Sequence, residues 1–453
     1  MSLNHLATRF SCSWPWEIAV MLCDGRVVCG CADPYAKRVL GDARREPLAA
    51  IWQGATITRL RRDLDAGGSS FCGDCPLKLP LAEGETPRRR GSGAGPLPGR
   101  LFVECTAACN ISCFEACCAP ETGIARTRRA GMLDIDLFRR VIDEAGPTLG
   151  RVDFFNYGET FLHRRAVEMC EYVKARYPHV YLYTSTNGLA FTEEAVRRLV
   201  RSGIDEVTFS VDGATPETYA RYRQRGDFGR AMANLRTTVE EKARLGLDVP
   251  FVNWRYILFR WNDSDREMDL ARRLAADMGL DRLCWEITDH PESAFSRRFA
   301  PGTPEHEAIR HEIWDSSNLG NAIPGATPRA RIEVRGVPRG SPLGGRPGDH
   351  LPLDARVRNL CQRPFPATGA YGHRLVRLGA QLRAADGTLL ELDHARASLP
   401  RAIEAGDRAD LRIEVPLPQA AGRYQLAFDL VSEGVDWFER CGSEVTVHDL
   451  VVR

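Results

Sequence analysis

The sequence predicts an α/β core placed between a cysteine-rich segment and an all-β region. Strand-like and helical patterns alternate from residue 101 to about 290, six cysteines fall before residue 76, and only short alternating strands follow from about 329. A chain of 453 residues with 43% hydrophobic content can bury more than one core. The expected domains are a cysteine-rich domain at 1–76, a linker at 77–100, an α/β core at 101–325 and a β-sandwich at 326–453.

The core contains six strand-like runs, separated by helical patterns such as DIDLFRRVIDEAG and TEEAVRRLVRSG. Strand-length apolar runs that alternate with amphipathic helices are typical of a parallel sheet covered by helices, either open or closed as a barrel. Six repeats are fewer than the eight of a complete barrel. The runs cover residues 101–105, 152–158, 180–188, 206–213, 253–259 and 282–288.

The C-terminal region lacks helical patterns. Segments such as RARIEVRGV, ADLRIEVPL and GRYQLAFDLV alternate apolar and polar residues between turns, which predicts an immunoglobulin-like β-sandwich. The segment from Glu433 to Phe438 resembles sandwich modules of bacterial polysaccharide export and glycosyl-transfer proteins. That resemblance implies a carbohydrate-linked substrate; the alternative is a stabilising or protein-docking module.

Charge and cysteine content narrow the function classes. With 61 basic and 60 acidic residues the net charge is +1, so no global field favours nucleic acid or an anionic membrane. The start, MSLNHLATRFSCSWPW, lacks a basic n-region followed by an apolar h-region, so we expect no signal peptide, and no apolar run is long enough to span a bilayer. We therefore expect a cytoplasmic protein, in which fifteen cysteines indicate metal or redox chemistry. The isolated Cys170 and Cys284 are expected to be small buried hydrophobes.

A loop after the first strand concentrates thiols. Cysteines recur there at every fourth residue, and Cys118 is adjacent to the last of them. Thiolates are soft ligands, and several from one short loop are typical of an iron–sulfur site. Parallel α/β folds build their sites at the carboxyl ends of the strands, so polar residues at those ends are expected to face this loop. The four loop cysteines are Cys105, Cys109, Cys113 and Cys117, and the polar strand ends include Glu159, Asn187, Ser210 and Asp212.

These motifs together resemble the radical S-adenosylmethionine (radical SAM) superfamily. The resemblance rests on the cysteine loop, the turn from Tyr157 to Thr160, the Thr-Asn-Gly ending at Gly188 and the Ser-Val-Asp-Gly ending at Gly213. It implies a partial (β/α)6 TIM-type barrel that binds a [4Fe–4S] cluster and S-adenosylmethionine.

The resemblance also implies roles for individual residues. The family spacing CxxxCxxC would put the third ligand at Ala116, but the cysteine comes one residue later. The implied ligands are Cys109, Cys113 and Cys117, with Cys118 as the alternate third ligand, and Cys105 is not a ligand. Glu159 would accept hydrogen bonds from the cofactor's amino group, Ser210 and Asp212 would contact its ribose, and Asn187 would line the cavity. An N-cap or turn role is the alternative for Asp212.

The N-terminal cysteines form a second group. A DGxVxC hairpin that ends at Cys29, followed by a distant CxxC, resembles SPASM or twitch domains, although such a domain usually follows the barrel. The resemblance implies one auxiliary [4Fe–4S] cluster, with Cys31 as a substitute ligand, and a structural zinc site is the alternative. The expected ligands are Cys12, Cys29, Cys72 and Cys75.

The predicted function is that of a radical SAM enzyme. It would reductively cleave S-adenosylmethionine and abstract hydrogen from an unidentified peptide, sugar or glycolipid, with an external one-electron reductant of the flavodoxin or ferredoxin type. The sequence assigns no catalytic residue and no reaction subclass among oxidoreductase, transferase and isomerase. The alternative is a non-catalytic zinc-binding scaffold with a carbohydrate-binding sandwich.

Overall fold

The structure is a computed structural model that divides into two compact units, each described by itself below. One comprises Met1–Leu283 with Ile287–Ala300, and the other comprises Cys284–Glu286 with Pro301–Arg453. The residues described are 9–31, 33, 35–81, 95–117, 119, 128, 131–309, 312–314, 329–337, 341–361, 364–367, 375–433, 436–441 and 443–453.

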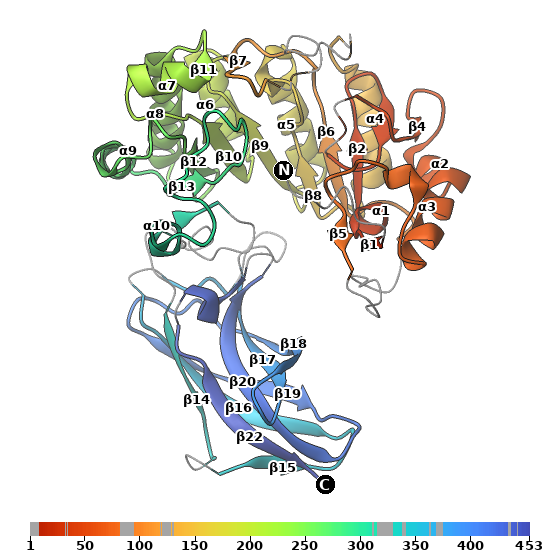
Figure 1. Cartoon of the computed structure of the whole chain (residues 1–453), viewed down its shortest axis with the longest axis vertical. Coiled ribbons are helices and arrows are strands. Elements are labelled where there is room, and N and C mark those ends of the chain that lie inside the picture. The colour runs from red at the N-terminus through yellow and green to blue at the C-terminus, as the bar shows by residue number, and fades with distance from the viewer. Residues whose placement is uncertain are drawn as a thin grey trace. The chain divides into compact units, whose positions relative to one another are not determined.

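A nine-stranded sheet has the order β13-β12-β10-β9-β8-β6-β2-β3-β4, and its strands from β12 to β4 form the centre of the first unit (Figure 1). Adjacent strands from β2 to β12 are parallel, whereas β3 and β4 are antiparallel additions at one edge. This confirms the predicted α/β class, while closure into a partial barrel stays a prediction. The strands are β2 (Ile18–Met21), β3 (Arg26–Val28), β4 (Val39–Asp42), β6 (Arg100–Val103), β8 (Arg151–Asp153), β9 (Tyr181–Thr186), β10 (Glu206–Ser210), β12 (Phe251–Ile257) and β13 (Arg282–Glu286).

The cysteine-rich segment contributes to this sheet. Its strand β2 pairs in parallel with β6, and all four β2 residues are buried. A strand buried on both faces needs a continuous apolar run, and Ile-Ala-Val-Met supplies one. Smaller elements surround it: β1 (Phe10–Ser11), α1 (Trp14–Glu17), α2 (Leu48–Trp52), α3 (Ala55–Asp65), η2 (Ser70–Cys72) and β5 (Leu79–Pro80).

Helices follow the strands of the core, and side-chain caps fix where several of them begin. Thr192, Thr215 and Ser264 each accept a hydrogen bond from a backbone N–H of the first helical turn. These caps set the lengths of the loops that leave the strand ends. The helices are α4 (Ile135–Ala145), α5 (Ala166–Arg176), α6 (Glu193–Arg201), α7 (Pro216–Tyr222), α8 (Phe228–Arg244) and α9 (Asp265–Met278), with the short η3 (Thr160–Leu162) and the ribbon strands β7 (Ser112–Cys113) and β11 (Arg223–Gln224).

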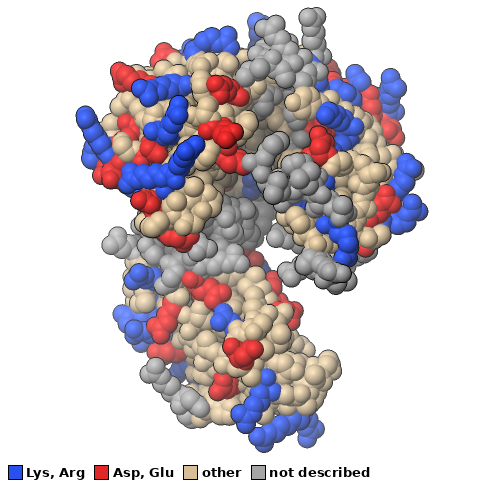
Figure 2. Space-filling view, in the orientation of Figure 1, with Lys and Arg blue, Asp and Glu red and all other residues tan. Residues whose placement is uncertain are grey.

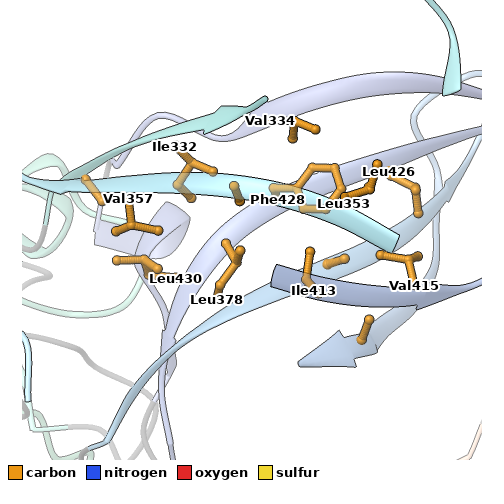
Figure 3. Close-up of a cluster of buried hydrophobic side chains, with 14 of the residues drawn as sticks. Ile332, Val334, Leu353, Val357, Leu378, Ile413, Val415, Leu426, Phe428 and Leu430 are labelled. Carbon is orange, nitrogen blue, oxygen red and sulfur yellow. The ribbon is translucent and has the colours of Figure 1, made fainter. Parts of the chain in front are cut away.

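The second unit contains two sheets that share one hydrophobic core. Ile332, Val357 and Ile413 of the three-stranded sheet pack in one cluster with Phe428 and Leu430 of the larger sheet (Figure 3). Alternating burial along β14 reproduces the predicted alternation, and the immunoglobulin-like identity stays a prediction. The elements are α10 (Pro304–Ala308), β14 (Ala330–Val334), β15 (Leu343–Gly345), β16 (His350–Asn359), β17 (Val376–Ala384), β18 (Leu389–Ser398), β19 (Arg408–Pro416), β20 (Gly422–Ser432), β21 (Asp436–Trp437), η7 (Phe438–Cys441) and β22 (Thr446–Val452).

The surface and the isolated cysteines agree with the sequence. Acidic and basic side chains are interspersed on the face of the first unit shown in Figure 2, as expected from the net charge of +1. Within the described ranges, no helix is long and apolar enough to cross a membrane. Cys170 and Cys284 are fully buried, which confirms their assignment as core residues.

Candidate functional site

The thiol-rich loop leaves β6 and lies against the turn that follows β8. The backbone N–H of Glu159 donates to Ala108 O at 2.8 Å, and a Cβ added at Gly158 would lie 2.7 Å from the same oxygen. Only a residue without a side chain permits this approach. The Gly-Glu pair therefore lies directly on the loop that carries Cys109.

Cys105 is buried where the loop leaves the strand. Its carbonyl accepts a hydrogen bond from Leu133 N at 2.8 Å, and its side chain is 1% exposed. Burial raises the pKa of the Cys105 thiol well above its ordinary value, and the nearby thiols of Cys170 and Cys23 raise it further. The groups near it thus include two core thiols, together with the carboxylates of Glu104 and Glu159.

Cys113 lies on a two-stranded antiparallel ribbon. β7 pairs with β11 so that Cys113 is opposite Arg223, and Phe114 N donates to Tyr222 O at 2.9 Å (Figure 1). Burial raises the pKa of the Cys113 thiol, and the nearby Arg223 guanidinium opposes this rise. Two negative groups near the thiol, Asp212 and Cys117, raise its pKa further. Two of the three predicted ligands, Cys113 and Cys117, are therefore close neighbours.

The turn between these two cysteines contains the residue that the family spacing lacks. Within it Glu115 adopts a left-handed backbone conformation with φ of 48°, which is uncommon for a residue other than glycine. Its carboxylate accepts a hydrogen bond from Ser293 Oγ at 2.6 Å. The longer turn is thus anchored from outside the loop. Cys118, the alternate third ligand, lies outside the described residues.

Asn187 joins the loop to the end of β9. Its Nδ2 donates to Asn110 Oδ1 at 2.8 Å and lies 3.7 Å from Cys109 Sγ. Its backbone N–H donates to Glu159 Oε2 at 2.8 Å. One residue thereby connects a predicted cluster ligand to the predicted cofactor-binding carboxylate.

Glu159 is 4% exposed and is fixed by three donors. Besides the hydrogen bond from Asn187 N, its carboxylate accepts hydrogen bonds from Thr186 Oγ1 at 2.7 Å and from Phe161 N at 3.3 Å. Burial raises the pKa of Glu159, while these hydrogen bonds and the Arg223 guanidinium oppose the rise. The site therefore presents a preorganised, buried carboxylate beside the thiols.

The two predicted ribose contacts have different surroundings. Ser210 Oγ lies 3.3 Å from Ser185 Oγ and accepts from Arg255 Nη2 at 3.2 Å. Both carboxylate oxygens of Asp212 are bonded within the protein, one to Arg223 Nε at 2.5 Å and the other to the backbone N–H of Ile257 at 2.7 Å. Asp212 therefore organises the strand ends, and a ribose contact by either residue stays a prediction.

The second group of thiols converges on one small cavity. All four predicted auxiliary ligands line it, together with the basic side chains of Arg38 and Lys78. Burial raises the pKa of Cys29, and it raises the pKa of Cys12 to about 11 and that of Cys72 to about 12. The lining cysteines are Cys12, Cys29, Cys72 and Cys75.

Cys31, the proposed substitute ligand, is not part of that lining. It packs instead against the buried cluster of Ile18, Val20 and Phe102. The structure thus separates Cys29 from Cys31, although only one residue lies between them in the sequence.

The donor chemistry of both thiol groups fits iron–sulfur clusters. Each group supplies soft thiols from short loops, and the first keeps a carboxylate and an amide beside it. In the described part of the chain, no group of three or more His, Cys, Asp or Glu side chains is arranged to hold a single metal ion. The raised thiol pKa values mean that cluster binding must displace protons.

Comparison with known proteins agrees with this chemistry. The model of the Radical SAM superfamily matches residues 103–271, and that of the SPASM iron–sulfur cluster-binding domain matches residues 12–76. The SPASM domain therefore precedes the radical SAM domain. Its match favours iron–sulfur over zinc for the N-terminal cysteines and argues against a non-catalytic zinc scaffold.

Individual relatives match only part of the chain. A tungsten-containing aldehyde ferredoxin oxidoreductase cofactor-modifying protein of Pyrococcus furiosus is 35% identical over 25% of this chain and 30% of that protein. Mycofactocin maturase MftC of Mycobacterium tuberculosis is 33% identical over 30% of this chain and 34% of that protein. The chain thus spans about a third of the length of these relatives.

Among solved structures, SuiB of Streptococcus suis bound to S-adenosylmethionine is similar to this chain. The TM-score is 0.35 and the identity 11%, over 49% of this chain and 45% of that one.

The two domain matches specify the cofactors. The radical SAM domain implies a [4Fe–4S] cluster with S-adenosylmethionine, and the SPASM domain implies auxiliary iron–sulfur. The chain therefore contains a domain of the Radical SAM superfamily, whose members are enzymes, with a SPASM domain ahead of it.

Proposed function

We propose that this chain reductively cleaves S-adenosylmethionine and abstracts hydrogen from a substrate, with Cys109, Cys113 and Cys117 as the ligands of the cofactor-binding cluster. The observation that carries the proposal is the position of Asn187, whose side chain contacts Cys109 while its backbone holds Glu159. A cluster bound by three thiolates keeps one iron open, and when bound it supplies the electron that cleaves the cofactor to methionine and a 5′-deoxyadenosyl radical.

The protein's own residues would bind and orient the cofactor beside these thiols. Glu159 would accept the cofactor's amino group, because its carboxylate is buried and its orientation is fixed by Thr186 and Asn187. Ser210 and Asp212 would contact the ribose of the cofactor. Asp212 would also hold Arg223 in place through their hydrogen bond. Asn187 would line the cofactor cavity on the side of Cys109.

The auxiliary cluster would be held by Cys12, Cys29, Cys72 and Cys75. The shared cavity supports this ligand set, and the basic side chains of Arg38 and Lys78 in its lining would offset the charge of four thiolates. With four protein ligands the cluster has no open iron, so electron transfer is the role we propose for it.

The substrate is proposed as a peptide, a sugar or a glycolipid. Two relatives are named as a maturase and as a cofactor-modifying protein, which supports a reaction that modifies a preformed molecule. The proposed electron donor is a flavodoxin or ferredoxin type of reductant. A reducing cytoplasmic compartment is the proposed location, because the open cluster requires a supply of low-potential electrons.

Anaerobic reconstitution tests the proposal. About eight irons and eight sulfides per chain are expected for two cubanes, and about four irons would mean that only one site is correct. Zinc bound without iron would contradict the proposal. The reduced chain should also release 5′-deoxyadenosine from S-adenosylmethionine, and comparison of peptides and metabolites from producing and deletion strains would identify the substrate.

A further inference from the structure

A buried arginine lies directly behind one of the proposed cluster ligands. Arg223 is 8% exposed and stands opposite Cys113 in the β7–β11 ribbon. Its Nη1 lies 3.6 Å from Cys113 Sγ, within the range of a hydrogen bond to sulfur. The sequence gives no sign of this contact, because 110 residues separate the two side chains.

The direction of the guanidinium is fixed from its other side. Its Nε donates to Asp212 Oδ2 at 2.5 Å, and the second oxygen of Asp212 accepts the backbone N–H of Ile257 at 2.7 Å. A planar guanidinium held by this hydrogen bond cannot turn its Nη1 away from the thiol without breaking the buried Arg223–Asp212 ion pair. Asp212 therefore sets the geometry of the Arg223–Cys113 contact.

The Arg223–Cys113 contact would affect how readily the cluster takes up an electron. Reduction adds one negative charge to a cluster, and a donor aimed at a ligand sulfur stabilises the reduced state more than the oxidised state. The effect is large where solvent is excluded, because screening by water is weak there. Among the described residues, the charged groups near this position include the carboxylates of Asp212 and Glu159, whose negative charges act in the opposite direction and offset part of the effect of Arg223.

We propose that Arg223, oriented by Asp212, is a positioning residue that raises the reduction potential of the barrel cluster through its hydrogen bond to the Cys113 thiolate. The inference rests on the proposed function, because it requires Cys113 to be a ligand. It goes beyond that function by naming the residue pair that makes the cluster reducible by a physiological donor.

The test is a redox titration of the reconstituted full-length chain, followed by electron paramagnetic resonance. The signal that changes when S-adenosylmethionine is added identifies the cluster with the open iron. Arg223→Met should retain its iron but lower the equilibrium constant for reduction about tenfold, which equals 59 mV for a one-electron couple. Arg223→Lys keeps the charge but cannot bridge both partners, so a smaller decrease, about threefold, is expected.

The matched control is Arg221→Met, which removes the same charge two residues earlier at an exposed position. It should leave the constant within twofold of the parent chain, because water screens exposed charges. A parent-like constant in Arg223→Met would overturn the proposal. If that variant does not assemble its cluster, Arg223→Lys decides: a threefold decrease supports the proposal, and a parent-like constant overturns it.

Failure of the proposed function would look different. If Cys113→Ala keeps the signal that responds to S-adenosylmethionine, the ligand set is wrong and the role of Arg223 falls with it. If Cys113→Ala loses that signal and Arg223→Met titrates like the parent chain, the ligand set stands and only the role of Arg223 is wrong.

Discussion

Gly158 lies so close to Ala108 that a Cβ at the glycine would stand 2.7 Å from the Ala108 carbonyl oxygen. The contact joins the turn after β8 to the loop that carries the first proposed cluster ligand, Cys109. Since the obstacle is backbone, the loop itself would have to shift to make room.

Gly158→Ala should therefore impair both cluster assembly and stability. We expect the variant to retain less than half of the iron of the barrel site and to lose about 1–3 kcal/mol of unfolding free energy, as overpacked sites do. Iron quantification and denaturant unfolding measure the two effects. Gly99→Ala is the control, because a Cβ there meets nothing within 4 Å. Full iron content in Gly158→Ala would show that the loop can adjust without loss of the site.

The ligand assignment predicts different outcomes for two cysteines of the same loop. Cys113→Ala should remove about four irons, because it deletes a thiolate of the barrel cluster. Cys105→Ala should keep them, because that thiol lies beside Cys170 and Cys23 in the core. Iron and sulfide analysis of both variants checks this. Loss of iron from Cys105→Ala would place the motif one repeat earlier in the chain.

The auxiliary site predicts a similar contrast. Cys75→Ala should lose about four irons and keep the cluster that responds to S-adenosylmethionine. Cys31→Ala should keep both clusters, since Cys31 packs against Ile18 and Phe102 and does not line the cavity. Iron content together with electron paramagnetic resonance distinguishes these outcomes. Equal iron loss in both variants would show that the lining of the cavity misidentifies the cluster ligands.

A pH effect is expected in the second unit from Asp429. Burial raises the pKa of this carboxyl from 3.8 to about 7, although the backbone N–H groups of Glu439 and Leu430 oppose the rise. Because the folded pKa is the higher one, the contribution to stability is fully present below pH 4 and is lost as the pH rises through 7.

Between pH 5 and 7 the unfolding free energy should fall by up to about 1.4 kcal/mol per pH unit from this group. Asp429→Asn should flatten the dependence, and unfolding followed across this pH range measures it. Asp354→Asn, at an exposed position, serves as the control. An unchanged slope in Asp429→Asn would mean that the carboxyl titrates normally in the folded chain.

The features of the fold that depend on local sequence patterns can be predicted from the sequence. The β–α alternation predicts the six core strands well, because apolar period and length are local properties. The structure shortens most of the predicted runs: β8 ends at Asp153, and the polar residues from Asn156 onward leave the sheet to form the turn. The two groups of cysteines were also predictable, since soft-ligand chemistry depends on residue type and spacing.

Pairings between distant segments could not be predicted in the same way. Nothing in the sequence of β2 indicates that it pairs in parallel with β6, about 80 residues later. The β7–β11 ribbon is likewise a non-local pairing, and it places Arg223 against Cys113. The sequence predicts a ribose contact for Asp212, but it does not show that both of its carboxylate oxygens have protein partners.

We propose that three thiolates of one loop leave an iron open to S-adenosylmethionine. The most direct measurement is formation of 5′-deoxyadenosine by the reduced, iron-loaded chain, compared with its Cys113→Ala variant. We expect 5′-deoxyadenosine from the parent chain and none above background from the variant. Equal amounts from both, or none from a parent chain that carries its full iron, would contradict it.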